Sequence, residues 1–322
     1  MKILLTGAAG FIGTHVRKIL VEHGHEVFTI DCFESRVHGA APDKSGMDFT
    51  YPCCYITPEE LNDVVPEVVV HLAAQVGVAD SMTDPNRYVT GNVADTTMFL
   101  ERLAKMKRPP RKIIVASSMS VYGDPHTSDP IGEEWPTTPA SVYGLTKYDQ
   151  ERLVLMLAPL MGATPVALRF FNVYGPGQAL TNPYTGVLAN FANNIFAGKP
   201  PIVYEDGLQT RDFIYVEDVA YAVVGAVEQD MEGVYNVCTG HAETILGVAE
   251  TMCRALNHST VPHLPGETRP GDVRHCIGRN LKLRLALPRW EPMPFASGMA
   301  LYAQHLLAST QAPADHTAPL AT

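Results

Sequence analysis

Short apolar runs alternate with longer amphipathic segments along the first part of the chain. Residues 2–6, 27–30 and 64–71 are nearly continuous apolar runs, which is typical of strands buried on both faces of a parallel sheet. Between the first two runs, residues 14–23 repeat their apolar positions at intervals of three and four, which predicts a helix that ends at Gly24. This alternation of strand and helix predicts an α/β protein with a parallel sheet.

The pattern continues with a predicted helix over residues 85–102 and a further buried strand over residues 112–116. Ser117 and Ser118 follow that strand directly. Because ligands of an open parallel sheet bind beyond the carboxyl ends of its strands, we expect both serines at the binding edge, together with Asp31 after the second strand. A serine pair in this position is also a common turn or helix cap, so the position alone leaves its role open.

A glycine-rich turn, Thr-Gly-Ala-Ala-Gly-Phe-Ile-Gly at residues 6–13, joins the first strand to the first helix. Its glycines let the backbone approach a pyrophosphate, and the helix N-terminus supplies N–H groups and a positive dipole end. Asp31 suits the ribose hydroxyls and repels a 2′-phosphate, which favours NAD over NADP, although Arg36 nearby complicates that choice. A tight turn in another α/β protein is the alternative. The predicted cofactor contacts here are Gly7, Gly10, Phe11, Ile12, Gly13 and Asp31.

Tyr143 and Lys147 are four residues apart, so on a helix they stand one turn from each other on the same face. A lysine ammonium and a nicotinamide cation would both favour the phenolate of a tyrosine that ordinarily titrates near pH ~10. The pair alone is common on solvated helix faces. Its catalytic interpretation therefore depends on a nicotinamide bound beside it.

Composition excludes several classes of function. The 322 residues predict about two domains, and 46% hydrophobic residues is ordinary for a globular protein. A net charge of −10 without a Lys/Arg-rich run argues against a nucleic-acid partner. The six cysteines form no C-x-x-C pair, which favours reduced thiols, a cytoplasmic location and no metal centre. No apolar stretch approaches the ~20 residues of a transmembrane helix, so we expect no membrane partner.

Seven motifs follow one another in a fixed order: TGAAGFIG (6–13), HLAA (71–74), SSMSVYGD (117–124), YGLTK (143–147), RFFNVYGPGQ (169–178), QTRDFIYVEDVA (209–220) and RPGDVRH (269–275). In this order they resemble the extended short-chain dehydrogenases/reductases, in particular the NAD-dependent epimerase/dehydratase family and its nucleotide-sugar 4-epimerases. The resemblance covers nearly all of residues 1–290. It implies a Rossmann doubly wound parallel sheet with a smaller mixed α/β substrate domain.

The resemblance assigns a catalytic triad of Ser118, Tyr143 and Lys147. Tyr143 would take the proton from a sugar hydroxyl, and Ser118 would hydrogen-bond the same oxygen. Lys147 would hold the nicotinamide ribose and lower the tyrosine pKa. Further cofactor contacts are implied for Leu72, Ala73, Ala74 and Asn92.

The resemblance also implies a site for a nucleotide-diphosphate sugar. Asn172, expected just after the sixth strand, would reach the sugar or its phosphates, and the Arg211 guanidinium would pair with the diphosphate. Tyr204 matches an aromatic residue that stacks on the base, although rings of this kind are often only part of a core. The substrate contacts implied are Ser118, Met119, Asn172, Val187, Tyr204, Arg211, Arg269 and Asp272.

Departures from the family pattern bear on the reaction. Dehydratases that eliminate across C5 and C6 place an acid pair where this chain has Met119 and Ser120, and sugar-acid decarboxylases have a glutamate at the second position. The absence of both acids favours 4-epimerisation through a 4-keto sugar, which needs only the triad. Cys54 stands where an aspartate near the adenine is common, and Asp80 stands where many relatives carry arginine.

Residues 178–187 and 204–212 resemble the branch of epimerases that act on dTDP-6-deoxy sugars such as dTDP-L-rhamnose. Met119 would give an apolar wall that suits a 6-deoxy methyl group, although methionine beside a sheet is often plain core. A UDP-glucose/galactose-type 4-epimerase, a dehydratase, a 4-ketoreductase and a non-catalytic NAD-binding protein remain alternatives.

The resemblance also implies the organisation of the chain. Residues 1–170 with 207–238 would form the NAD-binding domain, and residues 171–206 with 239–308 the nucleotide-sugar-binding domain. Residues 309–322, rich in Ala, Pro and Thr without periodicity, are expected to be a disordered tail. A homodimer is expected, packed through two helices per subunit, one of them carrying Tyr143.

Overall fold

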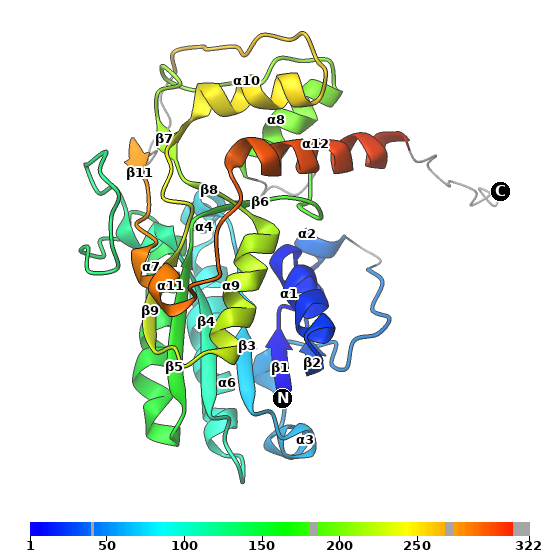
Figure 1. The fold of residues 1–322 in the computed structure, drawn as a ribbon. Coiled ribbons are helices and arrows are strands. Elements are labelled where there is room, and N and C mark those ends of the chain that lie inside the picture. Colours follow the sequence, from blue (N-terminus) through cyan, green and yellow to red (C-terminus); the bar gives the residue numbers. More distant parts are fainter. Residues whose placement is uncertain (40–41, 181–185, 268–272, 312–322) are drawn as a thin grey trace, which may run out of the picture.

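A six-stranded parallel sheet forms the centre of the molecule (Figure 1). The computed structural model describes residues 1–39, 42–180, 186–267 and 273–311. The strands lie in the order β2-β1-β3-β4-β5-β9, and every neighbouring pair is parallel. Their bounds are β1 (Lys2–Thr6), β2 (Glu26–Ile30), β3 (Val68–His71), β4 (Lys112–Ser118), β5 (Thr164–Phe170) and β9 (Gly233–Val237). The prediction of a doubly wound α/β fold is confirmed.

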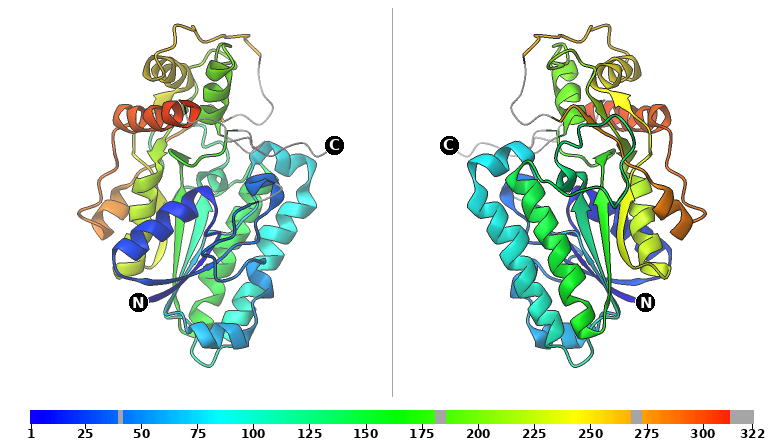
Figure 2. Two further views of the ribbon diagram at one scale, coloured as in Figure 1. Left: turned by 90° about the vertical axis from the view of Figure 1, so that its right-hand side faces the viewer. Right: turned by 90° about the vertical axis from the view of Figure 1, so that its left-hand side faces the viewer.

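Helices cover both faces of this sheet because its strands are apolar on both faces. On one face α1 (Phe11–Glu22) and α9 (Val216–Glu228) pack against Ile3, Leu5 and their neighbours. On the other face α3, α6 and α7 pack against Leu4, Val69, Ile113 and Val115. Figure 2 shows α6 and α7 side by side on that second face. The bounds of these three helices are α3 (Pro58–Val64), α6 (Asp95–Ala104) and α7 (Val142–Leu157).

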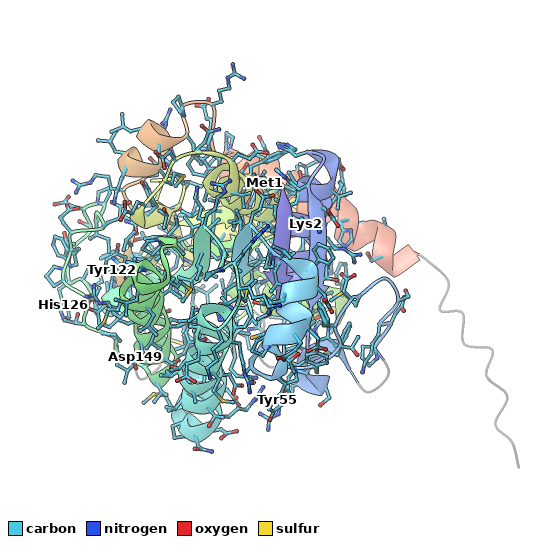
Figure 3. All side chains as sticks on the ribbon, turned by 90° about the horizontal axis from the view of Figure 1, so that it is seen from below. Met1, Lys2, Tyr55, Tyr122, His126 and Asp149 are labelled. Atoms are coloured by element: carbon cyan, nitrogen blue, oxygen red, sulfur yellow. The ribbon has the colours of Figure 1, made fainter. Side chains whose placement is uncertain are left out.

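A second apolar core lies beyond the carboxyl ends of the strands, at the top of Figure 1. It joins α8, α10 and α12 with β6 and β8, and Tyr174 is fully buried at its centre. Met1 and Lys2 lie at the opposite end of the molecule, the side that Figure 3 shows. The elements here are β6 (Asn172–Tyr174), α8 (Val187–Phe196), β7 (Thr210–Arg211), β8 (Phe213–Tyr215), β10 (Glu243–Thr244), α10 (Ile245–Ala255), β11 (His275–Cys276) and α12 (Phe295–Gln311).

Short elements complete the described chain. They are α2 (Ser35–His38), η1 (Cys53–Tyr55), α4 (Val78–Thr83), α5 (Pro85–Tyr88), η2 (Val89–Ala94), η3 (Met119–Tyr122), η4 (Pro159–Met161) and α11 (Leu281–Ala286). Of the four η elements, η2 is a π-helix and the others are 3₁₀-helices. No helix in the described ranges combines the length and the apolar character needed to cross a membrane.

Several predicted bounds are wrong. The helix expected over residues 85–102 is divided into α5, the π-helix η2 and α6, because Val89–Ala94 takes an i→i+5 pattern. The strand expected over residues 64–71 begins only at Val68. Val64 ends α3, and Val65 turns the chain with a φ of 49° before Pro66.

Three other bounds also differ from the sequence prediction. The strand expected over residues 112–116 continues through both serines to Ser118. Asn172 is the first residue of the sixth strand rather than a residue beyond it. Helix α12 continues to Gln311, two residues past the predicted start of the tail, and residues 312–322 lie outside the described part of the chain.

Candidate active site

The turn after β1 forms a cradle that excludes side chains. Gly7 has a φ of +70°, and a Cβ there would lie 2.8 Å from the backbone nitrogen of Ala73. A Cβ on Gly13 would lie 2.0 Å from the carbonyl oxygen of Gly7. Gly10 is the N-cap residue of α1 and has no side chain to cap it, so N–H groups of the first helical turn remain for an anion. The cradle therefore fits a dinucleotide pyrophosphate, as the glycine spacing predicts.

Asp31 lies beside this cradle at the end of β2. Its carboxylate is buried, and it accepts hydrogen bonds from the backbone nitrogens of Ala9 at 3.0 Å and Phe33 at 2.9 Å. The Arg36 guanidinium pairs with Asp80 at 3.6 Å. A carboxylate in this position fits the adenosine ribose of NAD and disfavours the 2′-phosphate of NADP.

Ser118 and Tyr143 come together where β4 meets the first turn of α7. The Ser118 hydroxyl donates a hydrogen bond to the Tyr143 side chain. Its oxygen accepts from the Ser120 nitrogen at 3.2 Å and lies 3.2 Å from the Ser120 hydroxyl. A Cβ on Gly144 would lie 2.5 Å from the Ser120 carbonyl oxygen, so only glycine lets α7 approach this turn so closely. Ser141 caps the helix by accepting from the Gly144 nitrogen at 3.0 Å. The local sequence thus fixes the serine and the tyrosine relative to each other.

The acid–base properties of the pair differ in part from the expectation. Burial raises the pKa of Tyr143, and the hydrogen bond from Ser118 opposes that rise. The Lys147 ammonium, which was expected to lower the tyrosine pKa, instead donates to the side-chain oxygen of Gln150. Burial also lowers the pKa of Lys147 to about 7, against the opposite influence of Glu151.

Leu72, Ala73 and Ala74 are partly exposed at the end of β3, and Ala73 faces the glycine cradle. Asn92 is fully buried in the π-helix η2. Its amide oxygen accepts from the Gln75 nitrogen at 2.6 Å, and its amide nitrogen donates to the Gln75 carbonyl at 3.1 Å. Asn92 therefore stabilises the segment after β3 through the backbone of Gln75.

The structure brings Met119 and Asn172 together next to Ser118. The amide nitrogen of Asn172 lies 3.4 Å from the Met119 sulfur and donates to the Asp212 carbonyl at 3.0 Å. The other expected substrate contacts belong to the segments around the second core: Val187 begins α8, Tyr204 lies between α8 and β7, and Arg211 ends β7. Arg269 and Asp272 lie outside the described residues.

Sequence reasoning missed a buried polar chain behind the triad. Gln150, His71, Thr96 and Thr6 are each at most 2% exposed, and they are joined by hydrogen bonds of 2.8 to 3.0 Å. Gln150 follows Lys147 by three residues and Tyr143 by seven, so all three share a helix face. That spacing was the only available signal, because the partners of Gln150 come from other elements.

It also missed a buried ion pair beside the triad. Arg169 of β5 donates two hydrogen bonds to the Glu151 carboxylate, at 2.7 and 2.9 Å. The Ser117 hydroxyl donates to the same carboxylate at 2.7 Å. Ser117 is therefore a structural partner of α7, whereas Ser118 faces the tyrosine.

This fold and site define a class: a dinucleotide-dependent enzyme of the short-chain dehydrogenase/reductase type. Residues 3–238 match the NAD dependent epimerase/dehydratase family, and the chain belongs to that family. It is an NAD-dependent enzyme.

Similar proteins of this family include nucleotide-sugar 4-epimerases and a dehydratase. The dTDP-L-rhamnose 4-epimerase of Burkholderia thailandensis is 31% identical over 331 residues, which cover 90% of each chain. The structure of the Thermotoga maritima UDP-glucose 4-epimerase with UDP-glucose matches with a TM-score of 0.86 and 30% identity, over 97% of this chain and 100% of the other. An NAD-dependent NDP-hexosamine 5,6-dehydratase from tunicamycin biosynthesis matches with a TM-score of 0.82 and 26% identity, over 95% and 97%.

Proposed function

We propose that the protein interconverts the C4 epimers of a nucleotide sugar through a transient 4-keto sugar. The observation that carries this proposal is the Ser118–Tyr143 pair at the end of β4, on the same edge of the parallel sheet as the glycine cradle after β1, with an apolar side chain, Met119, next to it. The family membership supports the cofactor and the reaction class. The relatives that are named as 4-epimerases support the reaction.

Each residue of the triad has one task in this reaction. Tyr143, in the phenolate form that a bound nicotinamide cation would favour, takes the proton of the sugar C4 hydroxyl and later returns it, while Ser118 hydrogen-bonds the same oxygen. Lys147 holds the nicotinamide ribose with its ammonium. NAD, when bound, supplies reversible hydride transfer at the sugar C4. Arg211 contacts the diphosphate, so that the sugar can turn over while the nucleotide stays in place.

The residues beside the triad favour epimerisation over elimination. A 5,6-dehydratase needs groups that remove the C5 proton and protonate the leaving hydroxyl at C6. Met119 has no titratable group, and its sulfur faces the amide of Asn172. Ser120 hydrogen-bonds Ser118, so its hydroxyl is part of the serine turn.

The test is incubation of the purified protein with a panel of dTDP-, UDP- and GDP-sugars, followed by NMR of the C4 configuration. In deuterated water the product should carry no solvent deuterium on carbon. Label at C5 would contradict the C4 mechanism and indicate elimination or enolisation. Tyr143→Phe should lower kcat by about 10²- to 10⁴-fold. Tyr148→Phe, on the same helix, is the matched control and should retain activity.

Within this function, a dTDP-6-deoxyhexose such as dTDP-L-rhamnose is the favoured substrate. The likeness to the Burkholderia enzyme over 90% of both chains supports it, as does the apolar Met119 beside the triad. The likeness to the Thermotoga enzyme favours a UDP-hexose instead. A higher kcat/KM for UDP-glucose than for dTDP-L-rhamnose would decide for this second candidate.

The division into an NAD-binding domain and a nucleotide-sugar-binding domain, with the bounds expected from the sequence, is part of the same proposal. So is a cytoplasmic location, which the six free thiols support.

We also propose a homodimer through α6 and α7. Their outer surface exposes Met98, Leu145 and Met156, each by 38% or more, and the adjoining Leu160 by 82%. Light scattering should give a mass of two chains for the wild-type protein and a mass of one chain for Met156→Glu.

A further inference from the structure

The ammonium of Lys147 is held by a neutral side chain of its own helix. Lys147 is 3% exposed, and its nitrogen donates to the amide oxygen of Gln150, which is fully buried. A buried ammonium needs such an acceptor, because it has lost the hydrogen bonds of water. The Glu151 carboxylate one turn further is already engaged by Arg169 and Ser117.

The amide of Gln150 is fixed from its other end. Its nitrogen lies 2.8 Å from the Thr96 hydroxyl, 3.0 Å from His71 Nε2 and 3.3 Å from the Ala73 carbonyl. All three groups can accept a hydrogen bond, since burial and Lys147 lower the pKa of His71 to about 3 and keep its ring neutral. The opposite amide orientation would set a donor against the ammonium. The oxygen of Gln150 therefore has to face Lys147.

The chain of hydrogen bonds continues to the glycine cradle. His71 Nδ1 lies 2.8 Å from the Thr6 hydroxyl, and this hydroxyl also accepts from the Ala73 nitrogen at 3.2 Å. Thr6 is the residue before Gly7, where the cradle begins. The position of the lysine and the shape of the cradle thus depend on the same chain of buried, hydrogen-bonded side chains.

Few charges surround Lys147. Glu151 lies on the same helix, but its charge is shared with Arg169 of β5. Tyr143 is protonated in the free protein at neutral pH, because burial raises its pKa, and His71 of β3 is uncharged there. Among the described residues, the Gln150 oxygen is the acceptor that hydrogen-bonds the ammonium, and Glu151 adds to its stabilisation through charge alone.

We propose that Gln150 is a positioning residue: it holds Lys147 in its protonated form at the cofactor edge, and the buried chain through Thr96, His71 and Thr6 holds Gln150. The importance of this contact for catalysis rests on the proposed function. The contact itself is independent of the proposed function, and it can be measured without substrate.

The test follows the Lys147 pKa by NMR on protein labelled with ¹³C at the lysine ε-carbon, with and without NAD. The Lys147 signal is assigned with Lys147→Arg. In wild type we expect a pKa of about 7 without NAD. Gln150→Met keeps the length but removes the acceptor, so the pKa should fall by about one pH unit. Gln150→Glu should raise it by a similar amount. The exposed Gln229→Met is the matched control and should leave it unchanged.

The pH profile of kcat gives the second readout. If the reaction needs protonated Lys147, activity declines as pH rises through the lysine pKa. Gln150→Met should then move this alkaline decline to lower pH, and Gln150→Glu should move it to higher pH. A purely structural role of Gln150 would lower kcat at every pH without moving the profile. If Gln150→Met does not fold, Thr96→Val releases the amide and should shift the pKa downward by a smaller amount.

The outcomes separate this inference from the proposed function. An unchanged Lys147 pKa in both Gln150 variants overturns the inference, even if wild type epimerises a sugar. Opposite shifts in the two variants support the contact, even if no sugar of the panel is epimerised. Opposite pKa shifts combined with an unmoved pH profile would overturn the catalytic part.

Discussion

Glu151→Gln tests the buried ion pair that anchors the catalytic helix. Glu151 and Arg169 are 1% and 5% exposed, and their closest nitrogen–oxygen distance is 2.7 Å. The substitution keeps the side-chain volume but removes the charge, and it turns an NH₂ group toward donors of Arg169 or Ser117. The Arg169 guanidinium would remain buried with the Tyr122 hydroxyl, at 2.8 Å, as its closest remaining partner.

The expected loss follows from that geometry. Breaking a buried pair by removing one partner costs about 3–5 kcal/mol, because an uncompensated charge stays in the interior. At about 2 °C per kcal/mol for a chain of this size, the unfolding midpoint should fall by about 6–10 °C. Glu151→Met combined with Arg169→Met leaves no buried charge, so it should be less destabilised than the single variant.

Thermal unfolding followed by circular dichroism measures these differences. Glu101→Gln, an exposed position on α6, is the control and should lie within about 0.5 kcal/mol of wild type. A fall of less than about 2 °C in Glu151→Gln would refute the reasoning. It would mean that water or a rearranged side chain satisfies Arg169.

Three further predictions follow from other buried or constrained groups. The folded protein keeps His71 neutral down to a pKa of about 3, whereas an unfolded histidine takes up a proton near pH ~6.5. The contribution of His71 to stability is therefore complete above pH ~6.5 and declines on acidification. In His71→Asn the slope of the unfolding free energy against pH should be shallower by up to about 1.4 kcal/mol per pH unit. Equal slopes in the variant and in wild type would count against a neutral His71. Gly13→Ala must open the cradle, so calorimetry should show NAD affinity reduced by about tenfold or more. In Gly24→Ala the φ of +77° costs some stability, but the Cβ meets nothing within 4 Å, so this variant should bind NAD normally. Cys32 is the one exposed cysteine among six, but partial desolvation of its thiol and the negative charge of Asp31 raise its pKa. Mass spectrometry should therefore find a single, slowly alkylated thiol in the native protein.

Local patterns were sufficient to predict which strand ends share one edge of the sheet. The strands that end at Thr6, Ile30 and Ser118 are apolar runs, and a parallel sheet brings their carboxyl ends to one edge. The glycine spacing and Asp31 lie within one strand–helix–strand unit. Their relative positions therefore depend on contacts that are short in sequence.

The partner of Lys147 could not be predicted in the same way. Gln150 is polar at a position that faces the interior, and its contacts with His71, Thr96 and Ala73 join three segments that are far apart in sequence. Helical spacing indicates only that Gln150 lies near Lys147. Whether a buried amide takes up the ammonium is decided by tertiary packing.

The interruption at η2 has a similar cause. The apolar spacing over residues 85–102 is compatible with one continuous helix, because a π-turn adds only one residue to the register. What favours the turn is the set of bonds that Asn92 makes to Gln75 and Thr146 across two other segments. No local signal encodes those partners.

The π-helix η2 makes the length of this segment as important as its composition. Removing one residue from Val89–Ala94 would allow an ordinary α-helix, which the backbone tolerates well. Because a π-turn accommodates one extra residue, the helices on either side would keep nearly their present orientation. The wide turn itself would be lost, and with it the position from which Asn92 bonds Gln75 and Thr146. Natural variation here should therefore replace residues and leave their number unchanged.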